Sequence, residues 1–290
     1  MKVRALEPDD AGAVAAIVRA DEEALRGRPS HVDAAEVAAW WERTDLERHS
    51  WLFEENGAAV AAGWFFTYGR KAAFGGIVAQ GSKGRGLGAS IVERAEATAG
   101  DHGLERMHTW VLPEDAAAVA LFRRRGYEEV RRFFEMAIDL DAPPPDPVPP
   151  AGLVLDGFRA ADARAFHAAT LEAFEDHWDW HPTPFDEWWE QRRANDHSLW
   201  FVVRDGGEIA AIVRNERREN AGYVGIIGVR RPWRGRGLGK ALMQRSFQAF
   251  WERGLRRATL HVDAESPTGA AKLYESVGMH VESEAATYER

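Results

Sequence analysis

The chain has 290 residues, 45% of them hydrophobic and 29% charged, which is ordinary for a globular protein and long enough for two domains. The formal net charge of −9 argues against a nucleic-acid partner, and a chain without cysteine has no disulfide, thiolate nucleophile or cysteine-based zinc site. No apolar run approaches the roughly 20 residues that span a bilayer, and residues 1–10 lack a signal-peptide core, so we expect a soluble, cytoplasmic protein without a membrane partner.

The first half of the chain alternates helical and strand-like patterns. In chain order, the expected elements are a strand at residues 3–6, a helix at 14–25, strands at 51–53 and 58–67, an apolar strand that enters a glycine-rich turn, a helix at 87–99, a strand at 107–111, and a short helix that exits at Gly126 and Tyr127.

A proline-rich segment at residues 141–150 follows, and we expect it to be a semi-rigid, extended spacer. The same order of elements then repeats. The expected elements are a strand at 153–158, a helix at 160–174, strands at 199–203 and 209–213, an apolar strand before a second glycine-rich turn, a helix at 238–251, a strand at 258–262, and a short helix that exits at Gly278 and Met279. We therefore predict a duplicated α+β chain with domains at 1–140 and 151–290.

The duplicated turn reads Gly84-Arg-Gly-Leu-Gly88 in the first half and Gly235-Arg-Gly-Leu-Gly239 in the second. Such a turn exposes backbone N–H groups at a helix N-terminus, where phosphate oxygens bind. Basic residues gather around the second copy, which favours an anionic ligand there; a solvated loop is the alternative. They are Arg230, Arg231, Arg234, Arg236 and Lys240.

Two familiar phosphate-binding patterns fit poorly. A Walker A motif would need glycine where Arg234 stands and a hydroxyl residue where Ala241 stands. The dinucleotide pattern fits Gly84 to Ala89, but Lys240 breaks it in the second copy. Both turns also lie deep within their halves rather than after a first strand.

A third pattern fits both copies. Arg234 to Gly239, and Lys83 to Gly88 with lysine in the first position, resemble the acyl-CoA pyrophosphate loop of the GNAT acetyltransferase superfamily. Downstream, Leu-Tyr274-x-x-x-Gly278-Met resembles the end of the second motif of that superfamily. The duplication resembles tandem, two-domain members such as mycothiol synthase. The resemblance implies two tandem GNAT folds, each with a mixed, mostly antiparallel central sheet flanked by helices.

The resemblance also implies acetyl-CoA as co-substrate and no metal. Backbone N–H groups of the second turn would hold the pyrophosphate, and residues 227–229 would pair with the pantetheine arm like an added strand. The implied contacts in the second half are Ile227, Gly228, Val229, Arg234, Gly235, Arg236, Gly237, Leu238, Gly239, Lys240 and Ser266. Many relatives have asparagine where Ser266 stands. The counterparts in the first half are Val78, Lys83, Gly84, Arg85, Gly86, Leu87, Gly88 and Ala89.

The two halves differ at the position of the general acid. The resemblance assigns to Tyr274 the proton that the departing thiolate needs; otherwise Tyr274 is a helix residue packed on the sheet. Its counterpart, Phe122, has no proton to donate. We therefore expect a catalytic second half and a non-catalytic first half that binds CoA weakly or not at all.

The strand before the second turn, residues 222–228, lacks the glutamate that some relatives use as a base. The remaining candidates are Glu172, Glu175, Asp176, His177, Glu216 and Asp263, unless the amine is already neutral. Residues 174–182 and 188–189 mix aromatic, acidic and histidine side chains, which suits an acceptor cleft for a cationic or sugar-like amine or tryptophans buried against the sheet. His177 and His181 would share a metal only on a helix, which Pro182 disfavours.

These patterns predict an N-acetyltransferase that moves an acetyl group from acetyl-CoA directly to the primary amine of a small molecule. A basic protein tail is a second possible acceptor. The alternative from another class is a non-catalytic acyl-CoA-binding or sensing protein. The residues fix neither the acceptor nor the oligomeric state.

Overall fold

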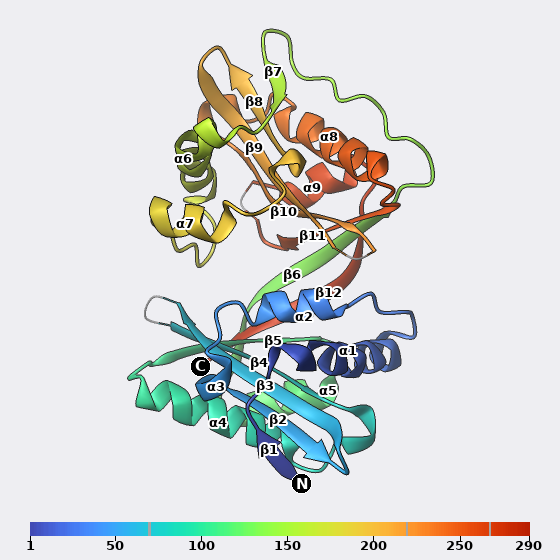
Figure 1. Cartoon of the computed structure of the whole chain (residues 1–290), viewed down its shortest axis with the longest axis vertical. Coiled ribbons are helices and arrows are strands. Elements are labelled where there is room, and N and C mark those ends of the chain that lie inside the picture. Colours follow the sequence, from blue (N-terminus) through green and yellow to red (C-terminus); the bar gives the residue numbers. More distant parts are fainter. Residues whose placement is uncertain (69–70, 219, 267) are drawn as a thin grey trace. The chain divides into compact units, whose positions relative to one another are not determined.

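The computed structural model describes residues 1–68, 71–218, 220–266 and 268–290. Within them the chain forms two compact units (Figure 1). Unit 1 consists of residues 1–132 and 284–290, and unit 2 consists of residues 133–283. Each unit has helices packed on a mixed sheet in which most neighbouring strands are antiparallel, so the predicted fold class is confirmed.

Unit 1 carries the first glycine-rich turn between β4 and α4. Its sheet has the order β1-β2-β3-β4-β5-β12, in which β4 and β5 are parallel. The strands are β1 (Lys2–Arg4), β2 (Ser50–Glu55), β3 (Ala58–Tyr68), β4 (Lys71–Val78), β5 (Arg106–Val111) and the end of β12 (His280–Glu289). The helices are α1 (Ala11–Arg26), α2 (Ala34–Trp40), α3 (Leu46–His49), α4 (Leu87–Asp101) and α5 (Ala116–Arg124).

The side chains of β3 divide the core of unit 1 between the two faces of the sheet. Trp64 belongs to a buried cluster with Val14 and Val18 of α1, and Phe65 belongs to a second cluster with Ile91 of α4. Successive side chains of a strand point to opposite faces, so one long apolar strand serves both clusters. As a result, α1 covers one face of the sheet and α4 covers the other.

Unit 2 carries the second turn between β10 and α8. Its sheet has the order β6-β11-β10-β9-β8-β7, in which β10 and β11 are parallel. The strands are β6 (Glu128–Asp139), β7 (Val154–Gly157), β8 (Trp200–Asp205), β9 (Glu208–Arg217), β10 (Gly222–Val229) and β11 (Arg257–Asp263). The helices are α6 (Ala163–Phe174), α7 (Phe185–Arg192), α8 (Leu238–Glu252) and α9 (Ala270–Glu275).

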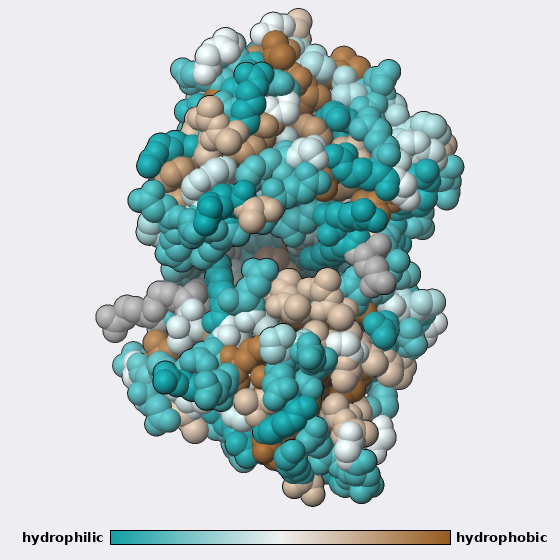
Figure 2. All heavy atoms as spheres, in the orientation of Figure 1, coloured by the Kyte–Doolittle hydropathy of each residue, from teal (hydrophilic) through white to brown (hydrophobic). Residues whose placement is uncertain are grey.

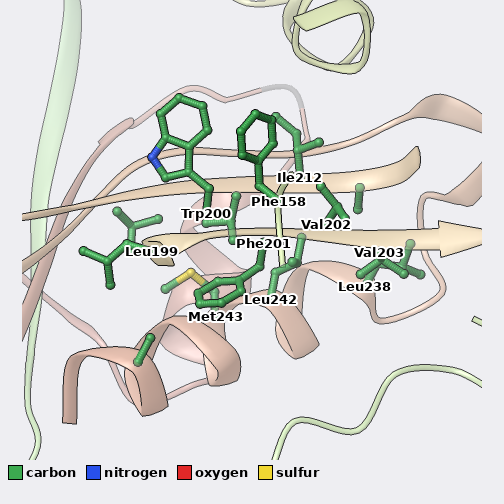
Figure 3. Packing of buried hydrophobic residues seen from close by; sticks show 14 of the residues in the cluster. Phe158, Leu199, Trp200, Phe201, Val202, Val203, Ile212, Leu238, Leu242 and Met243 are labelled. Carbon is green, nitrogen blue, oxygen red and sulfur yellow. The ribbon is translucent and has the colours of Figure 1, made fainter. Parts of the chain in front are cut away.

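The core of unit 2 is built on β8, whose first four residues are apolar and buried. Phe201 points toward Leu242 and Met243 of α8, and Trp200 lies on the opposite side of the strand near Phe158 (Figure 3). The rings of Phe158 and Trp200 are 5.0 Å apart between centroids. The apolar stripe of α8 thus covers one face of the sheet, while α6 and α7 cover the other.

The aromatic residues of α7 belong to this core. Trp188 is buried and stacks on Phe166 of α6, with ring centroids 6.1 Å apart. Trp178, in the segment before α7, instead contacts Phe133 of β6 at a centroid distance of 6.2 Å. Of the aromatic residues in 174–182 and 188–189, Trp188 is therefore buried against the sheet, whereas Trp178 contacts Phe133 instead.

The last strand of each half completes the sheet of the other unit. Residues 133–139 of β6 pair antiparallel with β11 of unit 2, and residues 286–289 of β12 pair antiparallel with β5 of unit 1. The compact units therefore differ from the predicted ranges 1–140 and 151–290 by these exchanged strands. Strands β5 and β11 each present an edge that accepts an antiparallel strand, so tertiary packing rather than local pattern decides the partner.

The proline-rich segment at residues 141–150 contains no helix or strand. The backbone N–H of Leu140 donates to the carbonyl of Arg256 at 2.7 Å just before it, and the amide of Gln248 donates to Asp146 at 2.8 Å within it. No helix of the described residues is long and apolar enough to cross a membrane. Hydrophilic side chains are spread over the visible face of each unit (Figure 2).

Candidate functional site

The second glycine-rich turn has a backbone that only glycine adopts easily. Gly235 and Gly237 have φ angles of +75° and +85°, and Gly237 is the N-cap of α8. A Cβ added at either glycine would meet no atom within 4 Å, so space around the turn is open. The N–H groups in the first turn of a helix have no intrahelical acceptor, so those of α8 are available to an anion.

Gly239 is required for a different reason. A Cβ at this position would lie 2.7 Å from Cδ2 of Leu273 on α9. Glycine therefore lets α9 pack closely against the first turn of α8. This contact places the helix that carries Tyr274 beside the turn.

The basic residues around the turn have two different roles. The guanidinium of Arg234 donates to the carbonyls of Val229 at 3.1 Å and Ala173 at 3.2 Å, so it holds the turn against β10 and α6. The side chains of Arg236 and Lys240 are exposed, and within the described part of the chain they make no hydrogen bond or ion pair. These two cations therefore remain for an anionic ligand.

Three of the predicted base candidates, at the end of α6 and just after it, pair with arginines that precede the same turn. Glu172 accepts from Arg230 at 2.6 Å. Asp176 accepts from Arg231 at 2.7 Å, and Glu175 forms an ion pair with the same guanidinium at 3.2 Å. Carboxylates engaged with arginine are poor bases, because the pairing stabilises the ionised form.

Strand β10 separates from its neighbour before it reaches the turn. Its pairing with β11 is restricted to Gly222 with Ala258 and Tyr223 with Thr259. On its other side, the register with β9 shifts between Val224 and Ile226, which is a β-bulge. Beyond that point, among the described residues, the edge of β10 that includes the predicted contacts at 227–229 has no strand partner on the β11 side. A free strand edge binds an extended ligand that carries amide groups.

Tyr274 lies in α9 and is buried, with 6% of its surface exposed. Burial raises the pKa of its phenol, and the neighbouring phenol of Tyr223 raises it further. The hydroxyl therefore keeps its proton at physiological pH. It sits in the core cluster of unit 2, so the packing on the sheet is confirmed, while its role as proton donor stays a prediction.

The other predicted residues of unit 2 lie near the ends of β9 and β11 or between α6 and α7. Ser266 is in the turn after β11, where its hydroxyl lies 3.0 Å from that of Thr268. Asp263 is buried at the end of β11. For His177, the burial of its own imidazole lowers the pKa. Glu216 forms an ion pair with Arg214 at 3.5 Å. His181 is outside any helix, and the described residues contain no group of three potential metal ligands.

One pair of polar side chains in unit 2 escaped the sequence analysis. The hydroxyl of Tyr223 lies 3.2 Å from Nδ1 of His261. The two residues are 38 positions apart in the chain, and only the register of β10 and β11 brings them together. The alternation of side chains along each strand is the one signal that would have put them on a common face.

The first turn has the same backbone but different surroundings. Gly84 and Gly86 have φ angles of +78° and +82°, and α4 begins at Leu87. Val78 ends β4, while Gly88 and Ala89 lie in the first turn of α4. Predicted contact residues of both halves therefore adopt a common backbone arrangement.

Carboxylates neutralise the cations of the first turn. The ammonium of Lys83 lies 2.6 Å from Oδ1 of Asp21 and 2.9 Å from Oδ2 of Asp115. Arg85 donates two hydrogen bonds to Glu55, at 2.7 and 2.9 Å. A phosphate at this turn would meet three carboxylates and no unpaired side-chain cation among these residues. The surroundings oppose the binding of an anion.

The strand before the first turn also lacks the bulge. β3 and β4 pair in one unbroken register from Ala61 with Val78 to Tyr68 with Lys71. A Cβ at Gly75 would lie 2.3 Å from the Trp64 ring, so the indole packs directly on the backbone of β4. Trp40 stacks on Trp64 at a centroid distance of 5.9 Å. Phe122, the counterpart of Tyr274, packs against Tyr127 at 5.3 Å.

Comparison with known proteins identifies the family. The model of the acetyltransferase (GNAT) family matches residues 14–127 and again residues 163–279. The chain therefore belongs to the acetyltransferase (GNAT) family and is an N-acetyltransferase with two tandem GNAT regions.

Several known proteins are similar to this chain. Mycothiol acetyltransferase of Acidothermus cellulolyticus is 30% identical over 226 residues, which cover 70% of this chain and 66% of that protein. A GCN5-related N-acetyltransferase from Sphaerobacter thermophilus is 33% identical, with a TM-score of 0.88 and coverage of 100% of this chain and 95% of that one. A tandem GNAT protein from the clavulanic acid biosynthesis pathway shares the fold at 17% identity, with a TM-score of 0.75 and coverage of 100% and 98%.

Proposed function

We propose that this chain transfers the acetyl group of acetyl-CoA directly to the primary amine of a small molecule, and that unit 2 carries out the reaction. The main support is the contrast between the two turns. The turn of unit 2 leaves Arg236 and Lys240 unpaired beside an open helix N-terminus, whereas Lys83 and Arg85 of unit 1 are paired with carboxylates. Unit 1 would then be a non-catalytic partner.

Binding would use backbone and side chains together. The N–H groups from Arg236 to Lys240 would hold the pyrophosphate, with charge-assisted contacts from the two unpaired cations. The free edge of β10 at residues 227–229 would pair with the amides of the pantetheine arm. One N–H of that edge would donate to the thioester oxygen and polarise the carbonyl, which acetyl-CoA supplies. Ser266 lies in the turn before α9 and would add a hydroxyl contact.

The transfer itself exchanges one bond for another. The amine nitrogen forms a bond to the carbonyl carbon and releases one proton to solvent, the carbon–sulfur bond breaks, and the sulfur takes a proton from the Tyr274 hydroxyl. Because burial raises the pKa of Tyr274, the resulting phenolate readily regains a proton from solvent. Acetyl-CoA is an intracellular thioester, so a cytoplasmic location accompanies this proposal.

A thiol-release assay with acetyl-CoA and a panel of primary amines tests the proposal. Mycothiol-related amines belong in the panel because relatives carry the name mycothiol acetyltransferase. We expect turnover with at least one small amine. Tight binding of acetyl-CoA, measured in parallel by calorimetry, without turnover on any amine would favour the non-catalytic acyl-CoA-binding alternative.

A further inference from the structure

A polar pair that the mechanism above does not use lies where β10 and β11 separate. The Tyr223 hydroxyl is 3.2 Å from Nδ1 of His261, and the guanidinium of Arg218 lies 3.7 Å from the centroid of the Tyr223 ring. Tyr223 is the last residue of β10 that pairs with β11, and it precedes the bulge by two residues. The pair therefore stands at the start of the free strand edge.

A carboxylate lies on the other side of His261. Glu135 of β6 is directly opposite His261 in the antiparallel register. Side chains in such a pair have Cβ atoms about 4.5–5.5 Å apart. The hydroxyl of Ser283 donates to Oε2 of Glu135 at 2.7 Å, which orients the carboxylate. Tyr223, His261 and Glu135 thus form a continuous row across three strands.

The charges around His261 set its protonation state. The loss of hydration among surrounding protein atoms is the largest effect and lowers the pKa of the imidazole. Glu135 opposes this effect and Arg218 adds to it. The imidazole is therefore neutral near pH 7 and can accept a proton, and His261 is an exposed residue.

The proposed reaction needs such an acceptor. A primary alkyl amine has a pKa near that of lysine, about 10.4, so it is protonated at neutral pH and must lose a proton before it attacks. Residues 222–229 contain no carboxylate, and Glu172, Glu175 and Asp176 are held by arginines. Tyr274 lies close enough to Tyr223 that the two phenols influence each other. One region would then hold the proton donor for sulfur and an acceptor for the amine proton.

We propose that Tyr223 and His261 deprotonate the acceptor amine. The Tyr223 oxygen takes one proton from the ammonium group while its own hydroxyl proton passes to Nδ1 of His261. The ammonium becomes a neutral amine, the imidazole becomes an imidazolium ion that Glu135 stabilises, and the proton then leaves to solvent. Tyr223 is the catalytic residue, and His261 and Glu135 act through it. This inference rests on the proposed function of unit 2.

Unit 1 lacks every member of this row. Its parallel pairing ends at Ala73 with His108, where unit 2 has Tyr223 with Thr259. Two residues farther along β5 stands Trp110, opposite Thr287 of β12. Alanine, tryptophan and threonine thus replace tyrosine, histidine and glutamate. The exchanged strand β6 supplies Glu135 to this row. Glu135 precedes the proline-rich segment, so residues 151–290 alone would lack it.

The pH dependence of kcat/KM for a basic alkyl amine tests the row. The activity of the natural chain should rise with pH as His261 loses its proton. His261→Asn and Tyr223→Phe should each lower the rate about 10²–10⁴-fold, the usual contribution of general acid–base catalysis. With a hydrazine, which is already neutral at the assay pH, the same variants should lower the rate far less. An equal loss with both nucleophiles would overturn the proposal.

Two charge variants move the same profile in opposite directions. Glu135→Gln removes a carboxylate that raises the pKa of His261, so the rise in activity should shift to lower pH; Arg218→Gln should shift it to higher pH. His280→Asn, an exposed histidine on β12, is the control and should change neither rate nor profile. If the pH profile shifts in neither variant, the role of Tyr223 and His261 is overturned. Turnover by the natural chain would still support the proposed acetyl transfer. Absence of wild-type turnover on any amine would overturn both.

Discussion

The two glycine-rich turns share a sequence and a backbone, but differ in what other elements bring to them. In unit 1, α1 supplies Asp21 and β2 supplies Glu55, and these carboxylates pair with Lys83 and Arg85. In unit 2 the exposed Arg236 and Lys240 have no such partners among the described residues. The comparison teaches that the motif specifies the shape of the turn, while its charge environment depends on residues far away in the chain.

The strands before the turns differ in the same sense. The register of β10 with β9 shifts at the bulge near Gly225, whereas β4 keeps an unbroken register with β3 and Trp64 packs on Gly75. The parallel pairing of both strands with their other neighbour ends early, at Tyr223 in β10 and Ala73 in β4. The absence of a bulge in β4 and the packing of the Trp64 ring on Gly75 are two separate features of unit 1. Both make unit 1 less suited to an extended ligand, which agrees with its proposed non-catalytic role.

The largest expected effect comes from exchanging the aromatic residues at the acid position. Tyr274→Phe removes only the hydroxyl, so kcat should fall about 10²–10⁴-fold with little change in folding. Phe122→Tyr, the matched change in unit 1, should leave kcat unchanged. Steady-state kinetics with the best amine of the panel measures both. Unchanged turnover in Tyr274→Phe would remove the acid assignment.

A smaller effect is expected at Lys83 of the first turn, where a substitution should change stability and leave the binding of acetyl-CoA unchanged. Lys83→Met leaves the buried Asp21 carboxylate without its cation, so we expect a loss of about 1–3 kcal/mol in the free energy of unfolding. The KM for acetyl-CoA should not change. Urea unfolding and steady-state kinetics check the two statements. A raised KM with normal stability would mean that Lys83 contacts the ligand.

The smallest effects concern the exposed cations. Arg236→Ala and Lys240→Ala should each raise the KM for acetyl-CoA about 10-fold, since a charge-assisted hydrogen bond contributes about 1.5–3 kcal/mol. High salt should reduce the difference in KM for acetyl-CoA between these variants and the natural chain, because it screens the charges. Arg85→Ala, the control in unit 1, should leave KM unchanged and have little effect on stability, because it breaks an exposed ion pair. Equal changes in KM from both turns would erase the contrast.

The sequence was most informative where function depends on local patterns. The turns, the apolar strands before them, the long helices after them and the difference between Tyr274 and Phe122 all follow from short motifs and periodicity. The exchange of β6 and β12 did not, because either strand has a pattern suited to either edge. The pairing of Lys83 with Asp21 and the row from Tyr223 to Glu135 depend on tertiary contacts between distant segments, and no local signal encodes them.

The stoichiometry of acetyl-CoA binding tests the contrast between the units most directly. Native mass spectrometry of the full chain, titrated with acetyl-CoA, should show one ligand per chain. Arg236→Glu with Lys240→Glu should abolish that binding, and Arg85→Glu should preserve it. Two ligands per chain, or one ligand that is lost on changing Arg85 and retained on changing Arg236 and Lys240, would contradict the assignment of the acyl-CoA site to unit 2.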